Sequence, residues 1–483
     1  MRGCYDCLLA ARDEYTALVG SSASGPSGQV SLATRLFETD LLIAVREKEL
    51  GLPPSRALAD AHRLAASLPP GSAATRYVAL AEAVPPSDLA VPGHELRAFR
   101  SRHADALGDM RDQIAWLSHG PLRTVLNEYL RLALNCAYFA QTDAGPPSKP
   151  RPAEALALEY RTHICGFGLI AALESVRGRE PRFVETSLFI ANTELALAPH
   201  DGPQRAHEHL AEAAAKWARS SAIDYLTASY DLWAGENEAA LVAFDRTLAV
   251  HPGHERARLG RTICLYRLGR AQDAIDNATQ LLELRSEYSV DALLWRARSH
   301  YMLHQLDEAR TDIFAAKEQT GTNDILGLSG IITYELDDLD TARTDLTAAL
   351  AVGPTDCTSR WYLALVEWRG RHWRQAGSGF SAAMTCFHDR AAESRARAAA
   401  LLARTDVAAA YRESAASNLT ASAEADRKEE RRSALSGAGC FAAAGDAAAA
   451  RALLDVAAED PALAEAVTRV RAQLNRTPSR RRP

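Results

Sequence analysis

Apolar residues recur at helical spacing along most of this chain, and in its central part the helical pattern itself repeats. Between residues 179 and 389, an alanine opens the second half of each repeated unit. Successive alanines lie 34, 34, 35, 33 and 34 residues apart, at Ala206, Ala240, Ala274, Ala309, Ala342 and Ala376. A period of this length predicts a stack of small helical units in place of a single globular core.

One unit illustrates the elements that this pattern predicts. Leu226 to Ala234 forms a first helix, Gly235 a turn, and Asn237 to Val250 a second helix. Two antiparallel helices approach closely only where the facing side chains of both are small. We therefore expect the two helices of each hairpin to be closest together at such a position. A small residue stands twelve positions before five of the alanines, at Ala228, Thr262, Ala297, Gly330 and Ala364.

The spacing of Ala240, Phe244 and Pro252 follows the pattern A-x3-F…P. In this pattern the chain resembles the tetratricopeptide repeat family. The resemblance implies an all-α fold, a right-handed superhelical α-solenoid of antiparallel helical hairpins. It also implies a non-catalytic scaffold or adaptor, because the first helices of that family line a concave groove that binds a partner protein or peptide. We expect a bacterial protein.

Irregular spacing and Pro/Gly-rich stretches divide the rest of the chain. We expect an irregular N-terminal helical region over 1–141, built as degenerate hairpins or as a capping bundle, and a linker over 142–152. The regular array is expected over 153–389 and a degenerate, alanine-rich, repeat-like cap over 390–475. Residues 476–483 form a basic tail, expected to be disordered.

By position, the resemblance places polar and aromatic residues of the first helices in the groove. They are Tyr225, Ser229, Tyr266, Arg298, Tyr301, Tyr334, Trp361 and Trp368. The family also favours an aromatic residue near this place for packing, so both a core role and a binding role stay open for the series Tyr266, Tyr301, Tyr334 and Trp368. The lysine and asparagine clamp with which some members hold a chaperone's C-terminal carboxylate is missing. A more apolar ligand segment is therefore expected.

The chain has eight cysteines, and most of them lie on apolar helix faces. Cys357 opens a first helix and Cys386 lies near the end of the following second helix, which makes a disulfide between them plausible by geometry. Such a bond would imply an oxidising compartment. Cys4 and Cys7 form a C-x-x-C pair without the second pair of a zinc site, so we expect them to be small core residues.

Composition and motifs exclude several classes of function. A net charge of −6 does not fit a nucleic-acid-binding body, and no window approaches the roughly 20 apolar residues of a membrane span. The sequence contains no H-E-x-x-H, P-loop or G-x-S-x-G motif. We therefore expect no enzyme, cofactor or metal, and a protein or peptide partner; nothing predicts the oligomeric state.

Two alternatives stay open. The chain lacks an apolar signal segment, which predicts a cytoplasmic protein. An exported or periplasmic bacterial protein of envelope assembly, its leader absent from this chain, would look the same. The other alternative is a helical sensor or enzyme that binds a small apolar ligand or a signalling peptide in the groove.

Overall fold

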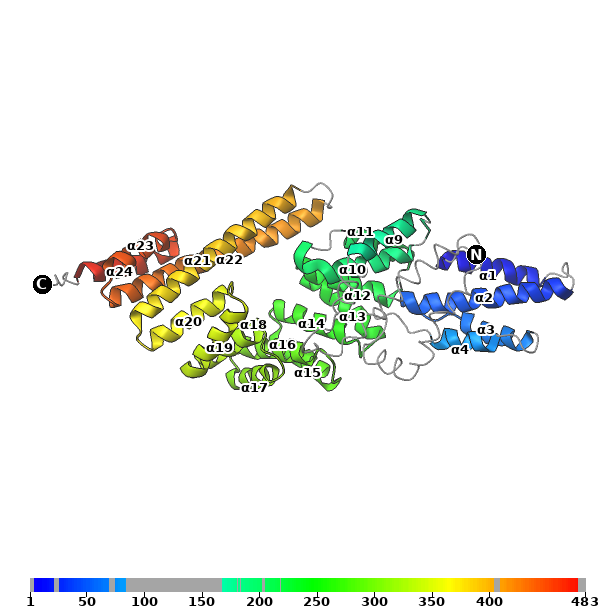
Figure 1. Cartoon of the computed structure of the whole chain (residues 1–483), viewed down its shortest axis with the longest axis horizontal. Coiled ribbons are helices and arrows are strands. Elements are labelled where there is room, and N and C mark those ends of the chain that lie inside the picture. The colour runs from blue at the N-terminus through cyan, green and yellow to red at the C-terminus, as the bar shows by residue number, and fades with distance from the viewer. Residues whose placement is uncertain are drawn as a thin grey trace, which may run out of the picture. The chain divides into compact units, whose positions relative to one another are not determined.

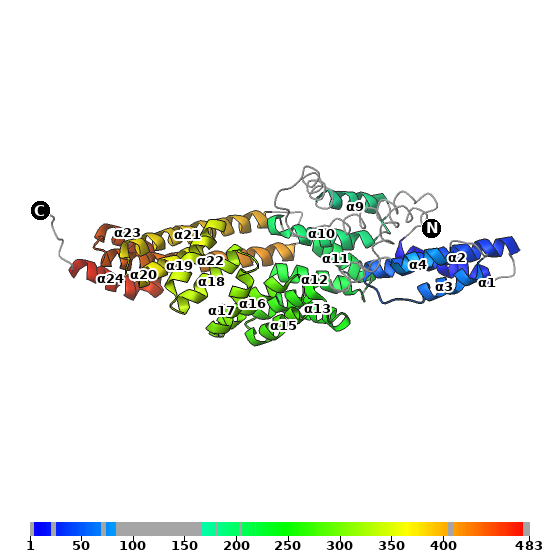
Figure 2. The same cartoon turned by 60° about the horizontal axis from the view of Figure 1, so that its bottom comes forward.

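The computed structural model describes residues 4–20, 26–68, 74–83, 167–179, 181–182, 184–201, 205–217, 219–403 and 409–476. Within these ranges the regular structure is helical, with no strand (Figures 1 and 2). The all-α solenoid of hairpins is thereby confirmed for the described part of the chain. The predicted linker 142–152 and all of the predicted tail except Arg476 lie outside it.

The chain divides into two compact units, residues 1–264 and 265–483, and each is described by itself. The boundary falls within α14 (Glu255–Arg267). The first unit contains α1 (Tyr5–Gly20), α2 (Pro26–Leu50), α3 (Ala57–Ser67), α4 (Ala74–Ala83), α9 (Phe167–Arg179), α10 (Glu185–Asp201), α11 (Ala206–Lys216), α12 (Ser221–Ala234) and α13 (Asn237–Val250).

The second unit begins with α15 (Ala271–Glu283), α16 (Ser289–Met302), α17 (Leu306–Lys317), α18 (Asn323–Glu335), α19 (Leu339–Val352) and α20 (Cys357–Arg369). It ends with α21 (Trp373–Leu402), α22 (Ala409–Ala443), α23 (Ala447–Ala457), the short 3₁₀ helix η2 (Pro461–Leu463) and α24 (Ala464–Arg476). Consecutive helices pack on one another, and α16–α17, α18–α19 and α20–α21 are antiparallel hairpins of the predicted repeat.

In the first unit, the N-terminal helices are bonded to the hairpins that follow. The backbone N–H of Tyr5, at the start of α1, donates to the carboxylate of Glu185 in α10 at 2.6 Å. The Ser220 hydroxyl, next to α12, donates to the carbonyl oxygen of Leu50 at the end of α2 at 2.5 Å. These bonds hold α1 to α10 and the end of α2 to the start of α12.

The residues that mark the repeat are buried, as close approach between helices requires. All six marked alanines, from Ala206 to Ala376, are 0% exposed. In the α18–α19 hairpin, a Cβ atom added to Gly330 would lie 2.5 Å from Cγ of Leu346. The small residue of the first helix is thus in direct contact with the second helix. The corresponding residues of the other units are also buried, at 0–1% exposed: Ala228, Thr262, Ala297 and Ala364.

The turn between the two helices of a unit also recurs. One residue in each turn adopts the left-handed conformation, with φ between 56° and 86°, and the amide of the next residue donates to a carbonyl five positions earlier. This is the Schellman arrangement that ends many helices. Its left-handed residues are Gly235, Gly269, His304, Asp337 and Arg371.

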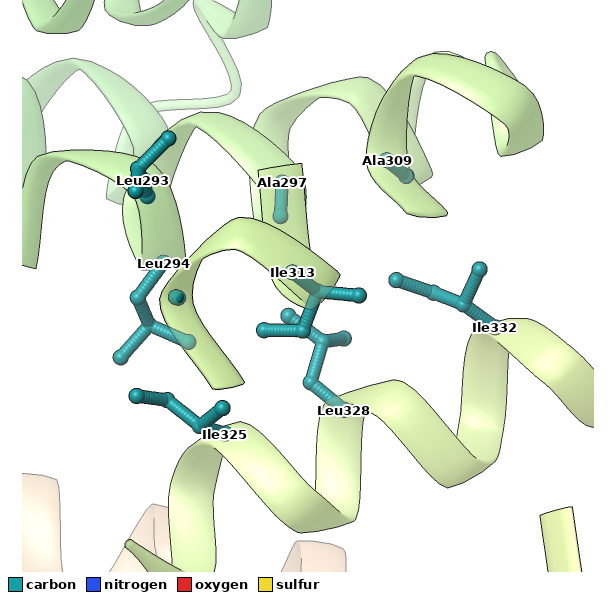
Figure 3. Close-up of a cluster of buried hydrophobic side chains, with 9 residues drawn as sticks. Leu293, Leu294, Ala297, Ala309, Ile313, Ile325, Leu328 and Ile332 are labelled. Carbon is teal, nitrogen blue, oxygen red and sulfur yellow. The ribbon is translucent and has the colours of Figure 1, made fainter. Parts of the chain in front are cut away.

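Aliphatic side chains from three consecutive helices form one of the buried clusters of the second unit. Figure 3 shows Leu294 of α16, Ile313 of α17 and Ile325 of α18 pointing into one shared cluster. Because one hairpin is too small to bury its own apolar face, each unit is completed by its neighbour.

The last hairpin is longer than the repeat predicts. Helix α21 runs for 30 residues and α22 for 35, and they pack against each other. Residue 389, the expected end of the regular array, lies inside α21, because no glycine or proline interrupts the chain from Asp389 to Leu402. Buried alanines form the interface, including Ala398 and Ala423. Residues 390–475 therefore begin with a long helical pair that the repeat pattern did not predict.

Gly330→Ala tests the close contact within a hairpin. The added methyl group must push Leu346 aside, so we expect the free energy of unfolding to fall by about 1–3 kcal/mol. In Gly439→Ala the methyl group meets nothing within 4 Å, and the variant should gain about 0.5–1 kcal/mol from helix propensity. Urea denaturation followed by circular dichroism measures both, and an equal effect in the two variants would contradict the packing argument.

Asp40 of α2 makes the N-terminal bundle sensitive to pH. The residue is 2% exposed and its Oδ1 has no hydrogen-bond partner. Burial, helped by the nearby charge of Asp60, raises the pKa of Asp40 from 3.8 to about 7, although Arg12 and Arg63 act in the opposite direction. The native state therefore holds a proton that the unfolded chain releases between about pH 4 and pH 7.

Stability should accordingly fall as the pH rises through this window and stay low above it. Asp40→Asn removes the buried charge, so we expect it to stabilise the first unit at pH 8 by on the order of 2–4 kcal/mol and to have little effect at pH 4. Urea denaturation midpoints of both proteins from pH 4 to pH 8 provide the measurement. A difference that does not change with pH would show that the carboxyl is not the titrating group.

Candidate functional site

Two of the expected groove residues, Tyr225 and Ser229, lie in the first unit, and both make contacts inside that unit. The Tyr225 ring packs against His254 and Phe244, with ring centroids 4.9 and 6.4 Å away. The Ser229 hydroxyl donates to the Tyr225 carbonyl oxygen in its own helix, α12, at 2.9 Å. Tyr225 thus contributes to packing between helices.

In the second unit, Tyr266 and Arg298 both contact Trp295, a residue that the sequence analysis did not identify. The Trp295 ring contacts Tyr266 edge-on, with centroids 5.3 Å apart, and the Arg298 guanidinium lies 4.5 Å from the Trp295 centroid. Arg298 also lies 3.7 Å from a carboxylate oxygen of Asp324. The sequence could have pointed to Trp295, because it lies three residues before Arg298 and residues three apart share a helix face.

Three tyrosines, Tyr301, Tyr334 and Tyr362, form a cluster across three first helices, and we call it the tyrosine cluster. The hydroxyls of Tyr301 in α16 and Tyr362 in α20 lie 3.3 Å apart, while the Tyr334 ring of α18 packs edge-on against Tyr362 at 5.5 Å. Burial raises the pKa of both Tyr334 and Tyr362, so these two hydroxyls stay protonated and neutral at physiological pH. Its chemistry is that of packing and neutral hydrogen bonds.

Arg369 closes one side of the tyrosine cluster. Its guanidinium lies 4.1 Å from the Tyr334 ring centroid and donates to the Tyr334 carbonyl oxygen at 2.9 Å. It also pairs with Asp337 at 3.0 Å. Tyr334 is only 5% exposed. These contacts favour the packing role for Tyr334 and Tyr301, the role that the sequence left open.

The two expected tryptophans differ in exposure. Trp361 is half-buried against Tyr362 and Phe380, at 5.1 and 6.1 Å, and its indole N–H is buried without an acceptor. Trp368 is 46% exposed at the end of α20. Within the periodic aromatic series, Trp368 is therefore the member whose ring is most open to a partner.

Two arginines follow Trp368 closely in the sequence, at the turn between α20 and α21 and the start of α21. Arg371 and Arg374 are exposed, and neither forms an ion pair within the described residues. His372 is held by Glu367 at 2.6 Å, and Glu367 also accepts from Arg343 at 2.9 Å. Although burial raises the pKa of Glu367, these two hydrogen bonds lower it overall and keep the carboxylate charged. The turn thus combines an open indole with uncommitted guanidinium groups.

Two disulfides are present among the described cysteines. Cys357 and Cys386, the pair expected from the hairpin geometry, are joined with an S–S distance of 2.10 Å. Cys4 and Cys7 are also joined, although we expected two small core residues. That expectation placed both in one helix, whereas α1 starts at Tyr5 and leaves Cys4 before it. Cys264 and Cys440 are buried and belong to neither disulfide, and burial raises the pKa of Cys440 to about 11.

The raised pKa keeps the Cys440 thiol protonated, and therefore a weak nucleophile, at neutral pH. In the described ranges no group of three or more His, Cys, Asp or Glu residues is arranged to hold a metal ion. In the same ranges, no helix combines the length and the apolar character needed to cross a membrane.

The chain matches no family model and no curated protein. It is similar to a tetratricopeptide repeat protein from Parabacteroides merdae, with 15% identity and a TM-score of 0.38, over 62% of this chain and 99% of that one. The APC/C hetero-tetramer Cut9–Hcn1 gives 13% identity and a TM-score of 0.32, over 96% of both chains. Yeast Tom70 gives 13% and 0.31, over 84% of this chain and 86% of that one. At TM-scores this low, the architecture rests on the period and the hairpins themselves.

Removing each disulfide in turn tests how much it stabilises the chain. Cys357 and Cys386 are 29 residues apart, so the chain-entropy relation gives a loss of about 3–4 kcal/mol for the double alanine variant. Cys4 and Cys7 are three residues apart, and their double alanine variant should lose about 2 kcal/mol. Urea denaturation without reductant measures the two losses, and natively isolated protein with free thiols at these positions would refute the bonds.

Proposed function

We propose that this protein is a non-catalytic scaffold that holds a segment of a partner protein against the first helices of its repeats. A stack of hairpins presents a continuous surface whose rigid helices keep the side chains in fixed positions. The packed rings of Tyr266, Trp295 and the tyrosine cluster support this proposal, because they make the surface stiff before any partner arrives. A preorganised surface loses little conformational entropy on binding.

The exposed Trp368 beside Arg371 and Arg374 is the observation that carries the proposal. Tryptophan and arginine dominate the energetics of protein interfaces. Trp368 offers a large apolar ring, and the two guanidinium groups have no carboxylate of their own within the described residues. The partner segment that fits is one with an apolar anchor next to acidic residues.

The remaining candidates take supporting roles in this proposal. Tyr301 and Tyr334 shape the surface through their packing, and Arg298 and Trp361 flank it. Tyr225 and Ser229 lie in the other compact unit and are not needed for it. Trp368 is therefore the residue through which contact with the partner is best tested.

We also propose that the protein works in an oxidising compartment. Two described cysteine pairs are joined as disulfides, and such bonds are rare where glutathione and thioredoxin keep thiols reduced. This supports the exported alternative over a cytoplasmic protein.

Photo-cross-linking from position 368 tests the scaffold proposal. A chain with benzoylphenylalanine in place of Trp368 should capture one dominant partner from a lysate of the native organism. The unaltered, untagged chain should compete for that partner and reduce its capture. The untagged Trp368→Ala variant should compete at least tenfold less well. Trp233→Ala is the matched control, because Trp233 is also exposed, at 37%, at the end of a first helix in the other unit. This control should compete as well as the unaltered chain.

The outcomes separate clearly. If Trp368→Ala and Trp233→Ala compete equally well for the captured partner, the binding surface does not lie at the α20–α21 turn. The absence of any captured protein would argue against a scaffold. Circular dichroism melting curves establish beforehand that each variant folds like the unaltered chain.

A further inference from the structure

The C-x-x-C pair at the start of α1 is closed as a disulfide, and the proposed scaffold surface does not use it. Cys4 lies immediately before α1, and the backbone N–H of Leu8 donates to its carbonyl oxygen at 2.9 Å, as the first hydrogen bond of the helix. Cys7 lies in the first turn of α1. The disulfide therefore encloses only two residues, Tyr5 and Asp6, and constrains the backbone of that single turn.

The two enclosed residues attach the start of α1 to three other helices. The backbone N–H of Tyr5 donates to the buried carboxylate of Glu185 in α10 at 2.6 Å. The Tyr5 hydroxyl donates to Glu47, also buried, in α2 at 3.2 Å. The Asp6 carboxylate lies 2.6 Å from the ammonium group of Lys216, the last residue of α11. The disulfide is thus closed over the dipeptide that anchors α1.

These contacts depend on the conformation of the first turn. The first four N–H groups of an α-helix have no acceptor within the helix, so the helix itself does not fix their directions. Hydrogen bonds weaken steeply when they are bent. The Tyr5 N–H therefore keeps its direction toward Glu185 only while the turn is held, and the Cys4–Cys7 bond is the covalent link that holds it.

The two cysteines differ in their access to a reagent. Cys4 is 1% exposed, whereas Cys7 is partly exposed. Thiol–disulfide exchange begins when a thiolate reaches a sulfur atom, so an external thiolate attacks at Cys7. Cys4 is then the leaving group, and its place at the N-terminus of α1 favours the negative charge that its sulfur takes up.

We propose that the Cys4–Cys7 disulfide is a redox clip: thiols open it, and its opening releases the start of α1 from α10 and α11. In the first step a thiolate forms a mixed disulfide with the Cys7 sulfur, and the Cys4 sulfur leaves with the electron pair and takes up a proton. In the second step another thiolate attacks the outer sulfur of the mixed disulfide and releases the Cys7 thiolate. Two external thiols are oxidised to one disulfide, and the Cys4–Cys7 bond is reduced to two thiols.

The other described disulfide provides an internal comparison. Cys357 and Cys386 are 29 residues apart and join two helices of the second compact unit. The contacts that anchor α1 all lie in the first unit, so opening Cys357–Cys386 should not affect them. A change in α1 that follows reduction is therefore assigned to Cys4–Cys7.

Hydrogen exchange of the full-length chain, measured by mass spectrometry, tests the release of α1. We expect amides in the first half of α1 to exchange at least tenfold faster after reduction with glutathione, and reoxidation to restore the slow rate. The variant with Cys357→Ala and Cys386→Ala should respond in the same way, because it keeps the redox clip. The variant with Cys4→Ala and Cys7→Ala should exchange fast at the start and should not respond to glutathione.

The position of the mixed disulfide is a second readout, which a purely structural bond would not provide. After brief exposure to glutathione and alkylation of free thiols, tandem mass spectrometry should find the glutathione adduct on Cys7 and the alkyl group on Cys4. A protein dithiol of the thioredoxin class is the second reductant. If it opens the redox clip at least tenfold faster than glutathione at equal thiol concentration, the natural reductant is a protein; the reverse order supports a small thiol.

Three results would overturn the proposal. They are unchanged exchange in α1 after Cys4–Cys7 has been reduced, adducts on Cys4 alone, and a disulfide that both reductants leave intact in the native chain. If the Cys4/Cys7 double variant does not fold, reduction of the unaltered chain still decides between these results. None of the measurements involves Trp368, so the scaffold proposal succeeds or fails separately.

Discussion

The contact between a small residue of one helix and the helix that follows it is the constraint on which this structure depends. At Gly330 there is no room even for a methyl group, and the six repeated alanines are completely buried. This contact sets the distance between the helices of a hairpin, and that distance decides which larger side chains can meet. The aliphatic core drawn in Figure 3 and the tyrosine cluster both form at the spacing that the small residues impose.

The same constraint explains how side chains are divided between structure and function. Where first helices lie close together, as α16, α18 and α20 do, aromatic rings contact one another and take part in packing. Trp368, at the end of α20, stays largely exposed. The functional candidate therefore lies where the repeat ends a first helix, at the Trp368 turn.

The period was predictable because every unit must make the same close contact, so small residues recur in the sequence. The helix bounds of α13 were predicted for the same reason. The left-handed residues His304, Asp337 and Arg371 were not predictable as such, since only glycine signals that conformation in a sequence. The length of α21 was missed because alanine-rich sequence is compatible with both a repeat and a continuous helix.

The candidate site was predicted less completely than the fold. Position within the repeat located Trp368 and the tyrosines, but it could not tell a packed ring from an open one, because that depends on the neighbouring helices. Tyr362 and Trp295 were overlooked since their importance comes from contacts with residues in other units.

The hydroxyl contact between Tyr301 and Tyr362 has a consequence for how the array comes apart. In most helical repeat proteins each unit touches only its neighbours, and a local opening spreads one unit at a time. Here α16 and α20 belong to units that are not adjacent, and their side chains meet over the intervening α18. Opening either outer unit breaks a contact that spans the middle one, which couples the three into a single cooperative element. The shortest segment that preserves this surface thus runs from α16 to α21, and a chain truncated inside that segment would lose more than the helices that the truncation removes.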